Sequence, residues 1–350
     1  MADSKLIKTS LKEAIQRAIV WLRIGRAVLF LGSPGLGKSA ALREELCVEL
    51  AKFHDGFDKL PVLLDLRLSY REGVDLRGYG KVDDERGTTR FYVPDEFPTE
   101  GPGVIFIDEI TQGEKSATHS AYQLILEKRL AEYVVPEGVY IVAAGNRPED
   151  GCGLRKFDSG LRQRFAYIPI EPSAAEFREW AVEHEVNEAI IAATFIYPEL
   201  IEGFDGKINE QQSTGRELVD LSKAIAYGIE DDQLLGFACD VIGEVAAIKL
   251  QPFVSNVYEG LIPLRDVYSD PSGARVPNYD EFDVAIAVTV ALAKNVKAKD
   301  VANTLRYVDR LESQFRALFA KTFPLLGGDK AIRAQAWEDW TIANKSLTLS

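Results

Sequence analysis

One eight-residue segment, Gly32-Ser33-Pro34-Gly35-Leu36-Gly37-Lys38-Ser39, constrains the fold more than any other part of the sequence. It has the pattern G-x-x-x-x-G-K-S and lies between an apolar run and a helical pattern over residues 40–52. In such a turn the backbone N–H groups curl around phosphate groups, and the N-terminus of the next helix adds partial positive charge. We predict a phosphate-binding loop; the alternative is a chance glycine-rich turn. The predicted contacts are Gly32, Ser33, Pro34, Gly35, Leu36, Gly37, Lys38, Ser39 and Ala40.

Two carboxylates follow a second apolar run. The segment Gly103-Val104-Ile105-Phe106-Ile107 leads directly into Asp108 and Glu109. Because parallel strands bind ligands at their carboxyl edge, these carboxylates are expected beside the phosphates. We predict that Asp108 and the Ser39 hydroxyl hold a magnesium ion, and that Glu109 polarises the water that attacks the γ-phosphorus. The alternative is an acidic N-cap cluster after a buried strand.

Two other segments place polar groups next to apolar runs. Asn146 follows the run Val139 to Ala144, and its amide can orient an attacking water without acting as a base. Its alternative role is to form a turn. Arg162 and Arg164 precede the run Phe165 to Ile170, and a planar, permanently charged guanidinium suits a finger supplied by a neighbouring subunit. The alternative for these arginines is a solvated turn.

Arg216 lies at the start of a predicted helix. Thr214 and Glu217 have capping-box spacing, which places Arg216 in the first helical turn. A cation there opposes the helix dipole, and a phosphate group nearby would account for it. An ordinary surface arginine is the alternative.

Five short apolar runs alternate with helical patterns in the first half of the chain. Runs that are apolar throughout are typical of parallel strands buried on both faces, so we predict an α/β fold with helices, including residues 11–24, on both sides of a parallel sheet. The runs are Ala27 to Leu31, Val62 to Leu66, Val104 to Ile107, Tyr140 to Ala144 and Phe165 to Ile170.

Helical patterns dominate from about residue 171 onward. We predict helices over 174–196, 217–229 and 284–293, and a long loop over 253–279, which is rich in Pro, Gly, Ser and Asn. Apolar residues at helical spacing predict a packed core in the C-terminal part: Val284, Ile286, Val288, Leu292, Leu311, Phe315 and Leu318.

Composition limits the partners of the chain. Its 350 residues include 41 Lys and Arg against 54 Asp and Glu, a net charge of −13 that disfavours nucleic acid. The three cysteines lack disulfide or zinc spacing, which is typical of a reducing compartment. The sequence shows neither a leader nor a run of about 18 apolar residues, so we predict a cytoplasmic protein without a membrane span.

Taken in this order, the segments resemble AAA+ ATPases, in particular the MoxR-like and dynein-related group of the helix-2-insert clade, over roughly residues 8 to 235. The resemblance implies a three-layer P-loop NTPase core (1–170), an α-helical lid (171–235) and further C-terminal helices (236–350) that extend the lid or form a separate region. It implies Walker A at residues 32–39, Walker B at Asp108 and Glu109, sensor 1 at Asn146, the arginine finger at Arg164 or Arg162, and sensor 2 at Arg216.

The stretch from Leu68 to Gly103 is too long for a simple connection and lies where the clade carries its insert. Within it, the glycines and aromatic residues of 75–80 and 90–94 predict a mobile loop that contacts a substrate. Its charges are mixed, unlike those of a basic stripe that binds nucleic acid. The alternative is a structural excursion packed on the core.

The resemblance also implies a function. We expect a magnesium-dependent ATPase that assembles as a homo-oligomeric ring, with six subunits in the family, and remodels a protein partner. MoxR-like ATPases commonly act as chaperones with a partner that carries a von Willebrand factor A domain. One alternative is a DNA-directed motor or restriction-type NTPase, which the acidic composition opposes. A nucleotide-gated scaffold is the other, and the presence of both Asp108 and Glu109 disfavours it.

Overall fold

The computed structural model describes residues 9–147, 150, 165–206, 211–230, 232–254, 262–278 and 280–348. The chain divides into two compact units. The first, here called the sheet unit, comprises residues 1–173 and 204–209; the second, the helical unit, comprises residues 174–203 and 210–350. No helix within these described ranges has both the length and the apolar character that a membrane crossing requires.

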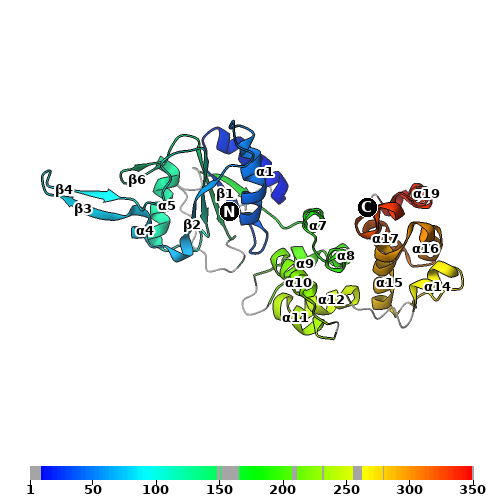
Figure 1. Ribbon diagram of the computed structural model, residues 1–350. Helices are drawn as coiled ribbons and strands as arrows, with labels where there is room; N and C mark the ends of the chain where they lie inside the picture. The colour runs from blue at the N-terminus through cyan, green and yellow to red at the C-terminus, as the bar shows by residue number, and fades with distance from the viewer. Residues whose placement is uncertain are drawn as a thin grey trace, which may run out of the picture. The chain divides into compact units, whose positions relative to one another are not determined.

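A five-stranded, all-parallel sheet forms the centre of the sheet unit (Figure 1). Its strand order is β2-β5-β8-β1-β9. All five apolar runs are confirmed as strands, with these bounds: β1 Val28–Leu31, β2 Val62–Arg67, β5 Gly103–Asp108, β8 Val139–Gly145 and β9 Ala166–Pro169.

Both faces of the sheet are covered by helices. Alternate side chains of a strand point to opposite faces, so Val28 and Phe30 pack in one apolar cluster, and Leu29 and Leu31 pack in another. The first cluster contains residues of α1 (Leu11–Arg23), and the second contains residues of α5 (Lys115–Glu127). The predicted α/β fold with three layers is therefore confirmed.

The helix predicted after the phosphate loop starts two residues earlier than expected. It runs through α2 (Lys38–Ala41), a π-helical turn η1 (Leu42–Leu46) and α3 (Cys47–Ala51). Its first residue is thus Lys38, which places the last residues of the glycine-rich segment on the helix itself.

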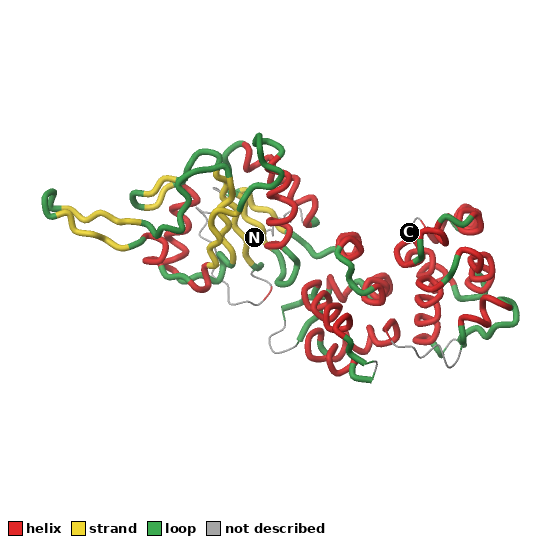
Figure 2. The backbone as a smooth tube through the Cα atoms, in the orientation of Figure 1, coloured by secondary structure: helices red, strands yellow, loops and turns green. Residues whose placement is uncertain are grey.

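The prediction of a loop over residues 68–103 is wrong for much of that stretch. It contains the 3-10 turn η2 (Leu68–Tyr70), the helix α4 (Gly73–Arg77) and an antiparallel hairpin formed by β3 (Tyr79–Asp83) and β4 (Thr88–Tyr92). We call this the insert hairpin; it projects from the sheet unit (Figures 1 and 2). Helix α4 packs against α5, where the Gly73 N–H donates to Ser116 Oγ at 3.1 Å. A second hairpin that we did not predict joins β6 (Arg129–Leu130) and β7 (Tyr133–Val134).

Helices form the helical unit, and two predictions made for it need correction. The helix predicted over 174–196 is two helices, α7 (Ala174–Glu183) and α8 (Glu188–Ile196), because Glu185 has a left-handed backbone (φ +54°) and Asn187 starts a new helix. Within the loop predicted over 253–279, the described part contains α14 (Leu264–Ser269). The remaining helices are α9 (Glu199–Glu202), α10 (Gly215–Tyr227), α11 (Leu234–Ile242), α12 (Glu244–Val254), α15 (Phe282–Asn295), η4 (Ala298–Asp300), α16 (Val301–Val308), α17 (Ser313–Leu326), α18 (Asp329–Ile332), α19 (Gln335–Ala343) and α20 (Lys345–Thr348).

The core predicted for the C-terminal part is confirmed. All seven apolar positions named above are buried, including Ile286 on α15 and Leu318 on α17. Aromatic stacking extends this core, since Phe323 stacks on Phe319 and meets Trp337 edge to face at 4.7 Å between ring centroids. Buried apolar residues of α15 to α19 thus belong to the same cluster as those of α7 and α8.

Replacing Asn187 with alanine is expected to destabilise the helical unit by about 1 kcal/mol, because its side chain caps α8 by accepting the Ala189 N–H at 3.0 Å. Urea unfolding of the helical unit measures this change. Asn187→Gly should cost only a few tenths of a kcal/mol, and Asn187→Asp should retain the cap. Equal losses for alanine, glycine and aspartate would contradict this role of the side chain.

Candidate functional site

Three neighbouring strands bring the predicted site residues to one edge of the sheet. Leu31 at the end of β1 pairs with Gly145 at the end of β8, and Ile107 near the end of β5 pairs with Ala143 of β8. The phosphate loop, Asn146 and Asp108 follow or end these strands. Residues more than 100 positions apart in the sequence therefore meet at the carboxyl edge, as a ligand site on a parallel sheet requires.

Two glycines give the phosphate loop its shape. A Cβ atom on Gly32 would lie 2.9 Å from the Ile170 carbonyl oxygen, so only glycine lets the loop leave β1 this close to the end of β9. Gly37 has φ +86°, a left-handed conformation that ends the loop and starts α2 at Lys38. Gly35 is left-handed as well, and the backbone between these glycines forms the turn.

Lys38 has its ammonium group inside the loop. The residue is 9% exposed, and its Nζ donates to the carbonyl oxygens of Gly32 and Ser33, each at 2.8 Å. The same Nζ lies 3.4 Å from Asn146 Oδ1. These are acceptors that a phosphate oxygen could replace, since a lysine ammonium is a mobile point charge with three donors.

Ser39 and Asp108 place a hydroxyl and a carboxylate in direct contact. The Ser39 hydroxyl donates to Asp108 Oδ2 at 2.8 Å, and Asp108 Oδ1 accepts the Glu109 N–H at 2.9 Å. A hydroxyl and a carboxylate in direct contact suit Mg²⁺, which takes one or two protein oxygens and completes its shell with phosphates and water. No group of three or more His, Cys, Asp or Glu that could hold a metal occurs among the described residues.

Glu109 has an unusual backbone. Its φ is +54°, a conformation that costs a non-glycine residue of the order of 1 kcal/mol and that recurs at functional sites. The Ser69 hydroxyl donates to Glu109 Oε2, whereas the Asp108 carboxylate accepts from Ser39, so the two carboxylates have different partners. Ser69 lies in η2, in the stretch predicted as a loop, and no sequence motif pointed to it.

A buried threonine accepts a hydrogen bond from the backbone of Asn146. Its N–H donates to Thr111 Oγ1 at 3.2 Å, and Thr111 is 5% exposed. The side-chain amide oxygen of Asn146 faces the Lys38 ammonium. Thr111 follows Asp108 and Glu109 closely in the sequence, so the two carboxylates and the amide are tied together by one short segment.

Arg147 joins this site, although the sequence analysis assigned it no role. Its guanidinium donates to Ser33 Oγ of the phosphate loop, to both carboxylate oxygens of Asp150 and to Glu171 Oε1. Burial disfavours the charged form, but hydrogen bonding to Asp150 and the charges of Asp150 and Glu171 outweigh it and raise the pKa of Arg147. An arginine directly after Asn146 in a turn segment was the only signal available from the sequence.

The structure does not test the roles predicted for three arginines. Arg162 and Arg164 lie outside the described residues. Arg216 lies exposed in the helical unit, in the first turn of α10, and its role stays a prediction. The helix begins at Gly215 after Thr214, but the capping box is not formed as predicted: the Thr214 side chain caps no backbone N–H and its hydroxyl donates instead to the Glu217 carboxylate.

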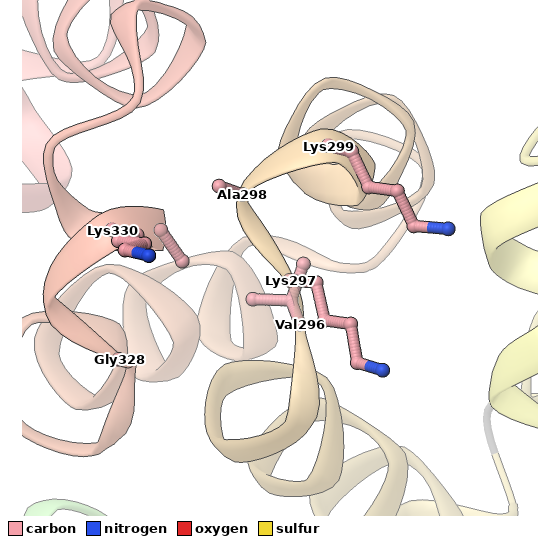
Figure 3. A pocket seen from close by; sticks show the side chains of 7 residues that line it. Val296, Lys297, Ala298, Lys299, Gly328 and Lys330 are labelled. Atoms are coloured by element: carbon pink, nitrogen blue, oxygen red, sulfur yellow. The ribbon is translucent and has the colours of Figure 1, made fainter.

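A depression of about 420 Å³ in the helical unit does not belong to the site. Apolar and lysine side chains line it, among them Val296, Lys297, Lys299 and Lys330. Figure 3 shows that Lys297 and Lys299 extend to one side, away from Lys330. The three ammonium groups therefore do not converge on one anion.

No protein-family model and no curated protein matches the chain. Solved structures show distant similarity. RuvB from Thermotoga maritima, in a lysine-to-arginine variant, is 16% identical, with a TM-score of 0.37 over 95% of this chain and 86% of that one. NtrX from Brucella abortus in complex with ADP is 12% identical, with a TM-score of 0.39 over 98% and 70%. An inferred ATPase from Cytophaga hutchinsonii is 19% identical, with a TM-score of 0.30, and the match spans 47% of each chain. Similarity at this level carries no conclusion about function, which depends on the site itself.

Proposed function

We propose that this protein is a magnesium-dependent AAA+ ATPase of the cytoplasm. The observation that carries the proposal is the contact set at the sheet edge. Lys38 lies within reach of Asn146, and Ser39 is bonded to Asp108, all at the ends of adjacent parallel strands. Hydrolysis of a nucleoside triphosphate uses groups of these kinds. They are a cationic donor for the phosphates, oxygen ligands for magnesium, an amide that orients water and a carboxylate that accepts its proton.

Each residue has a separate task in this reaction. Lys38 exchanges the Gly32 and Ser33 carbonyls for phosphate oxygens, while the backbone N–H groups of residues 32–39 cradle the phosphates. Ser39 and Asp108 hold magnesium, which when bound neutralises charge on the phosphates. Glu109 accepts the proton of the attacking water, and Asn146 orients that water.

The same proposal includes assembly. Arg164 or Arg162 of a neighbouring subunit would stabilise charge on the transferring phosphoryl group, and Arg216 would report the bound phosphates to the helical unit. Hydrolysis then requires a homo-oligomeric ring, for which we propose six subunits as in the MoxR-like group. Such a ring would remodel a protein partner in the manner of a chaperone, with a von Willebrand factor A domain protein as the partner class.

The insert hairpin supports a protein partner over the alternative of a DNA-directed motor. Exposed apolar and aromatic side chains occur on both of its strands, including Tyr79 (76% exposed) and Tyr92 (58%). Four basic and four acidic residues surround them, namely Arg77, Lys81, Arg86 and Arg90 against Asp75, Asp83, Asp84 and Glu85. Some of these charges cancel locally, since Arg86 and Arg90 each lie 3.9 Å from Asp83. A balanced surface with apolar side chains suits a protein better than a phosphate backbone.

Light scattering on the Glu109→Gln variant tests site and assembly together. With ATP and magnesium, the mass is expected to rise from that of the 38.8 kDa chain to about six times that value, because the variant traps bound nucleotide. The same variant with Lys38→Ala added serves as the control and should not change mass. A persistent monomer would contradict the ring. Stimulation of the wild-type turnover by DNA, with a steep salt dependence, would favour the motor instead.

A further inference from the structure

The side chain of Arg147 joins segments that are far apart in the sequence. Its side chain is 12% exposed and that of Asp150 is 3% exposed, so this ion pair is largely shielded from water. Arg147 Nη2 lies 3.0 Å from Asp150 Oδ1, and Nε lies 3.3 Å from Asp150 Oδ2. Asp150 also accepts the backbone N–H of Arg147 at 3.0 Å, which fixes the base of the side chain. The guanidinium is thus rigidly oriented by its carboxylate partner.

The other donors of this oriented guanidinium connect the phosphate loop to the end of β9. One reaches Ser33 Oγ, and Ser33 is one of the two residues whose carbonyls accept from Lys38. Another reaches the Glu171 carboxylate. Glu171 follows the bridge between Thr9 and Ile170, and its N–H donates to the Thr9 carbonyl at 2.9 Å. Ser173 is the last residue before the chain enters the helical unit.

We propose that Arg147 is a positioning residue that holds Ser33 in the phosphate loop and couples nucleotide binding to the docking of Glu171 at the end of the sheet. The inference rests on the proposed function. When a phosphate group binds the Lys38 ammonium, the Ser33 carbonyl loses its hydrogen-bond donor. The contact between Arg147 and Ser33 Oγ then keeps Ser33 in place. By reciprocity of linked equilibria, the bound nucleotide then stabilises the docked form of residue 171.

Calorimetric titration with ADP and magnesium measures the first half of the proposal. Arg147→Lys keeps the charge but lacks the planar guanidinium that reaches Ser33, Asp150 and Glu171 together, so ADP binding is expected to weaken about tenfold. Arg310→Lys is the control, because Arg310 lies in the helical unit and its guanidinium also donates to two acceptors, the carbonyls of Pro271 and Ala274. It should bind ADP as the wild type does.

Hydrogen exchange at the Glu171 amide measures the second half. In the wild type, ADP should slow this exchange several-fold, since a docked segment protects the bond to Thr9. Ser33→Ala keeps both ion pairs of Arg147 but cuts its contact with the loop, so the effect of ADP on the exchange should disappear. Glu171→Gln should weaken the effect of ADP on this exchange, because it removes the charge that pairs with Arg147. A purely structural role would change the basal exchange rate and leave the response to ADP intact.

The outcomes separate the two proposals. If the wild type binds ADP, and Arg147→Lys leaves the affinity unchanged and Ser33→Ala leaves the ADP-dependent exchange unchanged, the role of Arg147 is overturned while the ATPase proposal stands. If the wild type itself does not bind ADP, both the proposed function and the proposed coupling are wrong. Should Arg147→Lys fail to fold, as judged by its circular dichroism, Ser33→Ala and Glu171→Gln decide the question by themselves.

Discussion

Replacing Lys38 with alanine is expected to weaken nucleotide binding at least about 100-fold and to abolish hydrolysis. The ammonium group is buried in the loop and, in the proposed reaction, exchanges two backbone carbonyls for phosphate oxygens. A hydrogen bond to a charged group contributes about 1.5–3 kcal/mol, so the loss of two such bonds corresponds to roughly 3 kcal/mol or more. Calorimetric titration with ATP and magnesium measures the affinity, and phosphate release measures the turnover.

Thermal unfolding of the sheet unit provides an independent measurement of the same loss. A ligand at 100 times its dissociation constant stabilises the folded state by about 2.7 kcal/mol, and Lys38→Ala should show none of this stabilisation at the same concentration. Lys52→Ala is the matched control, because Lys52 directly follows α3, is exposed and pairs with its near neighbour Glu49. An affinity in Lys38→Ala within a factor of three of the wild type would contradict the assignment of the phosphate loop.

The sequence was sufficient to predict the parts of this fold that depend on local pattern. The three inner strands β5, β8 and β1 are nearly continuous apolar runs, because a parallel strand covered on both faces admits few polar side chains. Gly32 and Gly37 are required by close approach and by backbone angle, so the loop also has a local signature. Asp108 and Asn146 could be expected to meet because both end strands whose carboxyl ends share an edge.

Other features depend on contacts between distant segments and have no local signature. Both strands of the insert hairpin are largely exposed, so the alternation of apolar and polar residues that marks a half-buried strand is missing. The break between α7 and α8 depends on a left-handed glutamate, which propensity does not reveal. Ser69 and Arg147 acquire their roles from Glu109 and Ser33, partners 40 and 114 residues away in the chain.

The Glu109→Gln substitution is expected to lower the rate of hydrolysis by about 100- to 10,000-fold while leaving nucleotide binding nearly unchanged. Glutamine has the size of glutamate and can still accept from Ser69, but it cannot take a proton from water. The two Asp108 contacts, with the Ser39 hydroxyl and with the backbone N–H of residue 109, do not involve the Glu109 side chain, so they should stay intact in the variant. Single-turnover hydrolysis of bound ATP measures the chemical step apart from binding.

Two comparisons make this prediction specific to the position. Glu114→Gln removes a carboxylate that is exposed and only five residues further along the chain, and it should leave the rate unchanged. Ser69→Ala frees the Glu109 carboxylate without removing it, so its rate should fall between those of the wild type and Glu109→Gln. If Glu109→Gln turns over ATP at the wild-type rate, another group activates the water, and the pair of carboxylates after β5 serves magnesium and the backbone alone.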